Sequence, residues 1–188
     1  MASLYWFIGT VNHRLTLIDP RYTDIGIGAI NEGGVRIEAI DVGAPTWSDT
    51  ASPDWVAWPP DGTTGGGLSF AGEAPNPFPG ASYPVGYPIT LKYHGAGNVS
   101  FESATITANG QNVPDVAATG AGWLTRRTDM IAATQLLQPN TAYTVSGRGS
   151  VDGNGFARTW SFRTQAAGTE RLASSAPLNV DGLPTDVA

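Results

Sequence analysis

The chain has 188 residues, of which 41% are hydrophobic, so it is long enough to bury a core in one large domain or two small ones. Only 14% of the residues are charged, while 24 Gly and 14 Pro favour short strands joined by turns over helices. The net charge of −6 argues against a nucleic-acid partner, and the absence of Cys excludes disulfides, thiolate catalysis and Cys-bound metal. No apolar run approaches the length of about eighteen residues that spans a membrane.

The N-terminal part, residues 1–43, is predicted to contain a short helix or turn followed by a β-hairpin. The segments "IGIGAI" and "GVRIEAIDV" have the pattern of strands, and the intervening "NEGG" supplies residues that accept positive φ. We therefore expect a hairpin over about residues 25–42. Strand alternation places Ile37 and Asp41 on one face of its second strand, with Glu38 and Ile40 on the other.

Residues 44–87 form a connector rich in Pro, Gly and aromatic residues. Proline lacks an amide hydrogen and fixes φ, so this stretch is not helical. Its large aromatic side chains favour burial against a neighbouring element. We expect an ordered, extended connector with one short strand over residues 55–58.

Residues 88–166 have the clearest β pattern. Strands are predicted at "PITLKYH", "VSFESATITANG", "MIAATQLL", "TAYTVSGRGSV" and "ARTWSFRTQ". In "LQPNTAYTVSG" a Pro-Asn turn precedes a strand with Tyr143 and Val145 on one face, as at the corner before a central strand of a β-sandwich. The predicted fold class is mostly β, and residues 167–188 are a polar tail.

The segment "YWFIGTVNHRLTLIDPRYTDIGIGAI" resembles the C-terminal part of bacterial CAP (SCP/PR-1-like) domains. The matching residues are Trp6, His13, Arg14, Leu17, Pro20, Ile25, Gly26, Ile27 and Gly28. The resemblance implies a CAP-derived hairpin within residues 1–43. The family's pocket draws largely on helices that come before this segment and that have no counterpart here, so no CAP activity is implied.

Residues 85–165 resemble the Ig-like modules of bacterial exported and cell-surface proteins, through "YPITLKY", "LQPNTAYTVSG" and "WSFRTQ". This resemblance implies an Ig-like β-sandwich in an extracellular or cell-surface protein, and it implies no chemistry. The two resemblances together suggest the back end of a CAP-plus-Ig protein. Its apolar hairpin then needs cover from the Ig-like sheet, the connector or a second copy, and an unpaired strand edge favours a homodimer.

Carboxylates interleaved with aromatic residues are the candidate catalytic groups. Two carboxylates about 5–10 Å apart beside aromatic platforms can hydrolyse a glycoside. The first choice is Glu38 with Asp41, followed by Asp19 and Asp24. The alternative is that these carboxylates are hydrogen-bonded or ion-paired at the rim of a strand, for example with Arg14 or Arg36.

The candidate ligand-binding residues are aromatic or basic: Trp47, Trp55, Trp58, Trp123, His13 and Arg14. Trp55 and Trp58 are three residues apart in a predicted strand, so they are expected to face opposite sides. His13 and His94 are the only histidines, and they lack a recognised metal-ligand spacing. We expect neither a metal nor another cofactor.

Three functions of different class remain open. The first is a non-catalytic extracytoplasmic binding or interaction module, with a carbohydrate as one candidate ligand. The second is a carboxylate-dependent glycoside hydrolase, which requires two carboxylates in one cleft. The third is a self-associating structural fragment, in which apolar side chains are buried only between chains.

Overall fold

The structure is a computed structural model that describes residues 2–46, 48, 53–120 and 125–168. Two short helices come first, and strands follow. In chain order the elements are α1 (Ala2–Gly9), α2 (Val11–Leu17), β1 (Asp24–Glu32), β2 (Val35–Gly43), β3 (Trp55–Trp58), β4 (Thr63–Gly66), β5 (Ser69–Phe70), β6 (Val85–Gly86), β7 (Ile89–Tyr93), β8 (Val99–Ala108), β9 (Gln111–Val113), β10 (Asp115–Thr119), β11 (Thr128–Ala133), β12 (Ala142–Val151) and β13 (Asn154–Thr164).

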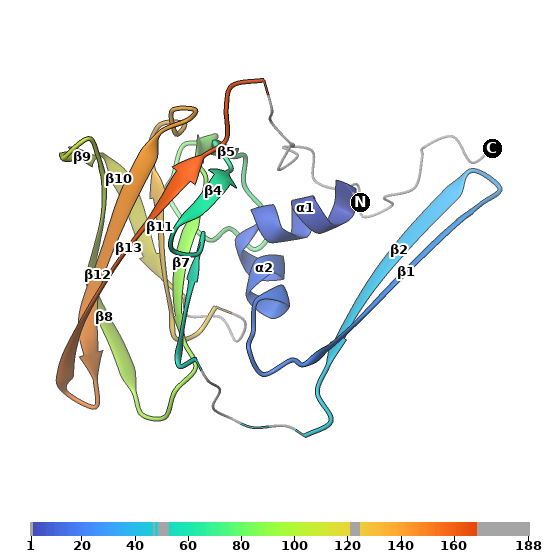
Figure 1. Ribbon diagram of the computed structural model, residues 1–188, viewed down its shortest axis with the longest axis horizontal. Coiled ribbons are helices and arrows are strands. Elements are labelled where there is room, and N and C mark those ends of the chain that lie inside the picture. The colour runs from blue at the N-terminus through green and yellow to red at the C-terminus, as the bar shows by residue number, and fades with distance from the viewer. Residues whose placement is uncertain (1, 47, 49–52, 121–124, 169–188) are drawn as a thin grey trace.

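Two sheets form the body of the molecule (Figure 1). A four-stranded antiparallel sheet has the order β10-β11-β7-β3, and a five-stranded sheet has the order β4-β13-β12-β8-β9. All neighbours in the five-stranded sheet are antiparallel except β4, which pairs in parallel with β13. The chain is therefore mostly β, as the sequence predicts.

The inward faces of the two sheets share one hydrophobic core. It contains Ile89 and Leu91 of β7, Ile106 of β8 and Trp160 of β13. The β7 side chains alternate, so the residues between these apolar positions point to the opposite side of the sheet. At the edge of this core the hydroxyl of Tyr143 accepts a hydrogen bond of 2.7 Å from the amide of Gln138, as expected for a sandwich corner.

A second core lies on the outward face of the four-stranded sheet. There Met130 of β11 packs with Val11 and Leu15 of α2 and with Phe70 and Phe78 from the segment before β7. The helices therefore add a third layer to the two sheets. Val11 and Leu15 are four residues apart, which places them on the same side of α2.

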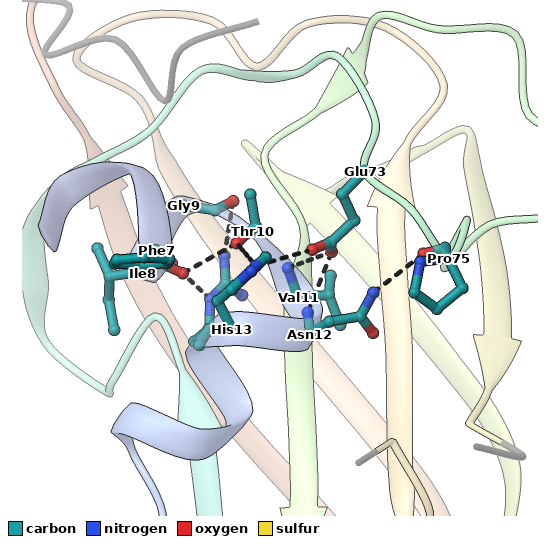
Figure 2. Close-up of polar contacts among 10 residues, drawn as sticks. Phe7, Ile8, Gly9, Thr10, Val11, Asn12, His13, Glu73 and Pro75 are labelled. Carbon is teal, nitrogen blue, oxygen red and sulfur yellow. Dashed lines mark hydrogen bonds and ion pairs between the residues drawn. The ribbon is translucent and has the colours of Figure 1, made fainter. Parts of the chain in front are cut away.

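The N-terminus of α2 is capped by a residue distant in sequence. Glu73 Oε1 accepts hydrogen bonds from the amides of Val11 at 2.5 Å and Asn12 at 3.1 Å (Figure 2). Thr10 occupies the cap position, but its side chain makes no capping bond. A carboxylate at this position satisfies amides that have no partner inside the helix.

Arg14 fastens both helices to the sandwich. Its guanidinium is completely buried and donates to the carbonyls of Ile8 at 2.7 Å, Gly9 at 3.3 Å and Pro88 at 2.8 Å. The first two carbonyls belong to the C-terminal end of α1, where helix carbonyls lack intrahelical partners. The third precedes β7, so one side chain joins α1 and α2 to the four-stranded sheet.

Strands β1 and β2 form a hairpin that projects away from the sandwich (Figure 1), and residues 24–43 are called the arm below. The turn consists of Gly33 and Gly34 with φ of 59° and 83°, the pair of positive values that a tight hairpin turn requires. The register runs from Asp24 opposite Gly43 to Glu32 opposite Val35 without a bulge. The predicted hairpin over residues 25–42 is thus present.

The connector contributes more strands than the sequence predicted. The short strand at residues 55–58 is present as β3, but the same stretch also supplies β4, β5 and β6. Because β3 and β4 belong to the two main sheets, those sheets begin near residue 55 and not at the expected boundary of residue 88. Strand β4 has the sequence "TTGG", whose glycines offer no side-chain pattern to detect.

We expect Arg14→Met to lower the free energy of unfolding by roughly 2–4 kcal/mol, because three buried carbonyls lose a charged donor. The measurement is urea denaturation followed by circular dichroism. Arg163→Met is the matched control, since Arg163 is exposed and donates to the carbonyl of Asn140. It should cost about 0.5 kcal/mol. Equal losses in the two variants would contradict the anchoring role of Arg14.

Candidate interaction surface

The arm exposes large apolar side chains of a kind that folded proteins ordinarily bury. Ile25, Ile27, Ile30 and Ile37 have exposed fractions of 60%, 65%, 50% and 56%. They make up four of the seven large hydrophobic side chains exposed in the described part of the chain. Ile25 and Ile27 lie on one face of the hairpin, and Ile30 and Ile37 lie on the other. Exposed apolar patches mark surfaces that bind other molecules.

The two faces of the arm differ in chemistry. Residues directly opposite in an antiparallel pair share a face, so the rows Ile25–Val42 and Ile27–Ile40 lie on one side, which we call the isoleucine face. The other side, which we call the acidic face, has Asp24, Asp41 and Glu32 around the row Ile30–Ile37 and the small residues Gly26, Gly28 and Ala39.

The predicted carboxylate pair does not form. Glu38 lies opposite Ala29 on the isoleucine face, whereas Asp41 lies opposite Gly26 on the acidic face. Residues three apart in a strand point to opposite sides, so these two carboxylates cannot act on one substrate. This corrects the hypothesis of a Glu38–Asp41 pair, which the alternation of the strand itself excludes.

Asp24 and Asp41 do share a face, and their rows are adjacent in the hairpin register. Both residues are exposed on the open arm. Asp24 also accepts a hydrogen bond of 2.9 Å from the hydroxyl of Thr23. A glycosidase holds its two carboxylates around an enclosed sugar ring, whereas these two lie on an open two-stranded surface.

Asp19 lies in the turn between α2 and the arm and is 6% exposed. It accepts hydrogen bonds from Arg21 Nε at 2.9 Å, Arg21 Nη2 at 2.5 Å and the Arg21 amide at 3.0 Å. Burial acts to raise the pKa of Asp19, but these hydrogen bonds and nearby His94 outweigh it and hold the pKa below its ordinary value. A carboxylate held ionised in this way serves as a structural anchor.

His94 follows β7 and packs against Asp19, with 3.5 Å between Nδ1 and Asp19 Oδ1. The ring is 3% exposed, and burial lowers its pKa to about 4 despite the neighbouring carboxylate. Lys92, two residues earlier on the same face, is 7% exposed, and burial is the main cause that lowers its pKa to about 8. The cluster joins the base of the arm to the sheet and gives a substrate no access.

His13 meets Glu73 at the junction of the two helices (Figure 2). Its Nδ1 lies 3.5 Å from Glu73 Oε2 and 3.1 Å from Thr10 Oγ1. A nucleophile–base–acid relay needs the two partners on different ring nitrogens, but here both approach the same nitrogen. The ring also contacts Trp6 and Phe7, with centroids 4.7 and 5.0 Å away, so this cluster holds the helix junction together.

Arg14 was predicted to bind a ligand, but its side chain is 0% exposed and its donors are engaged by backbone carbonyls. The aromatic faces of Trp58 and Tyr87 also cover it, with centroids 5.8 and 4.9 Å from its guanidinium carbon. This burial gives Arg14 a structural role in place of ligand binding.

Of the four tryptophans predicted as ligand platforms, the structure describes two. Trp55 is half-buried among Tyr93 and Phe156, whose ring centroids lie 4.6 and 4.5 Å away. Trp58 is half-buried on the opposite side of β3, where its Nε1 donates to the hydroxyl of Tyr87 at 3.0 Å. Trp47 and Trp123 lie outside the described residues.

Sequence reasoning did not single out Glu73 or the exposed isoleucines as functional positions. Glu73 acts on a helix 62 residues earlier in the chain, so no local motif reveals it. The isoleucines were visible as a strand pattern, but the sequence does not show whether another element covers them.

Across residues 2–46, 48, 53–120 and 125–168, no group of three or more His, Asp or Glu is placed to hold a metal ion. Within the same ranges, no helix has both the length and the hydrophobicity to cross a bilayer. No protein-family model matches the sequence, and no curated protein matches it either.

We expect His94 to make the free energy of unfolding fall as the pH is lowered. Its folded-state pKa of about 4 lies below the ordinary 6.5, so the unfolded chain binds this proton more readily. The stability contribution is complete above pH 6.5 and is lost as the pH falls towards 4, by up to about 3 kcal/mol. Urea denaturation of wild type and His94→Leu between pH 4 and 7 measures the difference.

Asp129 is a control whose contribution to stability changes with pH in the opposite direction. Burial raises its pKa to about 6 from 3.8, so its stability contribution is lost as the pH rises through that range. The two groups oppose each other between pH 4 and 6. Asp129→Asn should therefore lose stability on acidification more steeply than wild type, and His94→Leu less steeply. Identical pH profiles for His94→Leu and wild type would contradict the assignment.

Proposed function

We propose that this chain is a non-catalytic interaction module in which an Ig-like sandwich carries a projecting arm that binds another protein. The observation that carries the proposal is the arm itself, with four isoleucines at least 50% exposed. A binding surface reconciles this exposure with an otherwise well-packed molecule, because association removes the apolar area from water.

The strand order supports the Ig-like part of the proposal. In Ig domains one sheet has the order A-B-E-D and the other contains C, F and G, with an added C′ strand in some members. Here β3, β7, β11 and β10 take the first order, while β13, β12, β8 and β9 take the order G-F-C-C′. The hydrogen bond between Tyr143 and Gln138 is of the kind found at the corner before strand F.

The edges of the strands also support binding through the arm. In the two main sheets the edge strands β3, β4, β9 and β10 have only three to five residues, and short edges resist unwanted pairing. The arm strands have nine residues each and form no bulge. An isolated two-stranded hairpin is marginally stable in water, so a bound partner also stabilises the arm.

The extracytoplasmic location stays part of the proposal through the resemblance of residues 85–165 to modules of exported proteins. The proposal draws no activity from the CAP resemblance. Glycoside hydrolysis gains no support, since the favoured carboxylates lie on opposite faces of an open hairpin. The aromatic faces of Trp55 and Trp58 are partly used in internal packing, so they do not favour a carbohydrate ligand.

We expect a photo-crosslinking amino acid at Ile27 to give discrete covalent adducts in the cells that produce the protein. The same group at Thr144, which is exposed on the outer face of the five-stranded sheet, is the control and should give none. Adducts are detected as bands of higher mass by immunoblotting. If Ile25, Ile27 and Ile37 all fail to give an adduct that Thr144 lacks, the arm is not the binding surface.

A further inference from the structure

The arm exposes isoleucines on both of its faces. Ile25 and Ile27 lie on the isoleucine face, whereas Ile30 lies opposite Ile37 on the acidic face. A partner that docks on one face leaves the isoleucines of the other face in water. A third strand paired along one edge of the hairpin has side chains that alternate between the two faces, so it contacts both sets.

The register of the hairpin determines which backbone groups face its edges. Glu32 and Val35 are Cα partners that flank the two-residue turn, so they form a hydrogen-bonded pair. Such pairs alternate along an antiparallel ladder, so the N–H and C=O groups of the next pair, Asn31 and Arg36, point outward. The residues of β1 with outward backbone groups are therefore Ile25, Ile27, Ala29 and Asn31. Among the described residues, β1 pairs with β2 and with no other strand.

The two edges of the arm differ in charge and in exposure. The residues of β2 with outward backbone groups are Arg36, Glu38, Ile40 and Val42. Two of these four are charged, and charged residues on an edge strand oppose pairing. The outward residues of β1 are all uncharged, and β1 is exposed along its whole length, whereas Ile40 and Val42 of β2 are half-buried. The open edge of the arm is therefore that of β1.

Two glycines leave space beside this edge on the acidic face. A Cβ atom added at Gly28 would meet nothing within 4 Å, and one added at Gly26 would meet Asp41 Cβ at 3.9 Å. Glycine in a strand marks places where another chain approaches closely, and a large side chain on a neighbouring strand can cover it. A strand added to β1 thus has room for aromatic or large aliphatic residues opposite both glycines.

Carboxylates stand at both ends of the β1 edge. Asp24 begins the strand and Glu32 ends it, and both lie on the acidic face. Opposite charges on neighbouring strands stabilise their pairing, and like charges destabilise it. Full antiparallel overlap with β1 of a second copy would place Asp24 opposite Glu32 at each end. A strand of another protein with a basic residue near each end fits this edge instead.

We propose that the open edge of β1 receives an extended segment of another protein as a third strand, with large apolar residues over Gly26 and Gly28 and basic residues at both ends. The inference rests on the proposed function, because it names how the arm holds its partner. Main-chain hydrogen bonds supply affinity in this mode, and the alternating side chains supply specificity. A two-stranded hairpin is marginally stable in water, so the third strand also stabilises the arm.

Proline substitutions test the edge in the crosslinking experiment in cells. Ala29→Pro removes an outward N–H group from β1 and keeps every isoleucine, so it should reduce the Ile27 adduct at least about tenfold. Glu38→Pro is the matched control, because Glu38 lies directly opposite on β2 and its N–H group points to the other edge. This variant should keep the adduct. Unchanged thermal melting of both variants verifies that the sandwich remains folded.

Crosslinking from both faces of the arm gives a further check. The photo-crosslinking amino acid at Ile25 lies on the isoleucine face, and at Ile30 it lies on the acidic face. Because the side chains of a third strand alternate between these faces, both positions should capture the same protein and give adducts of the same mass.

A synthetic peptide gives a second readout that leaves the protein unaltered. The fluorescently labelled probe "KTVTYVYVK" places its tyrosines opposite Gly28 and Gly26 in an antiparallel pairing. Its terminal lysines then lie opposite Glu32 and Asp24. One version is N-methylated at its fourth and sixth residues, whose N–H groups face β1, and the other at its fifth and seventh residues, whose N–H groups face away. Fluorescence anisotropy should show at least about tenfold weaker binding for the first version, because it lacks donors towards β1.

Equal effects of Ala29→Pro and Glu38→Pro on the adduct, or equal binding of the two methylated peptides, overturn the pairing along β1. No binding of the peptide methylated on its outward side at about 1 mM also overturns it. Failure of this inference is distinguishable from failure of the proposed function. If Ile27 gives the same adduct in both proline variants, the interaction module stands and the partner docks elsewhere on the arm. If Ile25, Ile27 and Ile37 all give no adduct, both proposals fail.

Discussion

The attachment of α1 and α2 to the four-stranded sheet is the constraint on which the rest of the molecule depends. Arg14 donates to carbonyls of α1 and to Pro88, while Glu73 accepts the first amides of α2. Both side chains are buried and satisfy backbone groups that would otherwise lack partners. Because the arm follows α2 after a short turn, this attachment also fixes where the arm leaves the body.

The turn at the base of the arm is held by charge as well as by packing. Arg21 keeps Asp19 ionised, and Asp19 in turn contacts His94, which follows β7. Burial disfavours the charged forms of both His94 and Lys92, so the cluster is costly to assemble. Its burial explains why residues that resemble catalytic groups in the sequence act as supports.

The edge strands of the arm and of the sandwich differ in length. The sandwich keeps its edge strands to five residues or fewer, whereas the arm extends nine-residue strands into solvent (Figure 1). In the proposed function, this long hairpin, whose isoleucines no other described element covers, is the binding surface. The carboxylates Asp24, Asp41 and Glu32 lie on one face of the arm, and the isoleucine face carries Glu38 beyond its two apolar rows.

The sequence by itself determined the strand-rich class, the hairpin and the main strands of the sandwich, because alternation and turn residues act over a few neighbouring positions. It also contained the fact that Glu38 and Asp41 face opposite ways, since a strand has a period of two. Only the tertiary structure decided that "TTGG" forms β4, that Glu73 caps α2 and that Arg14 is buried. Each of these outcomes depends on contacts between residues far apart in the chain, which local patterns do not encode. For the same reason, only the tertiary structure shows that no other described element covers the isoleucines of the arm.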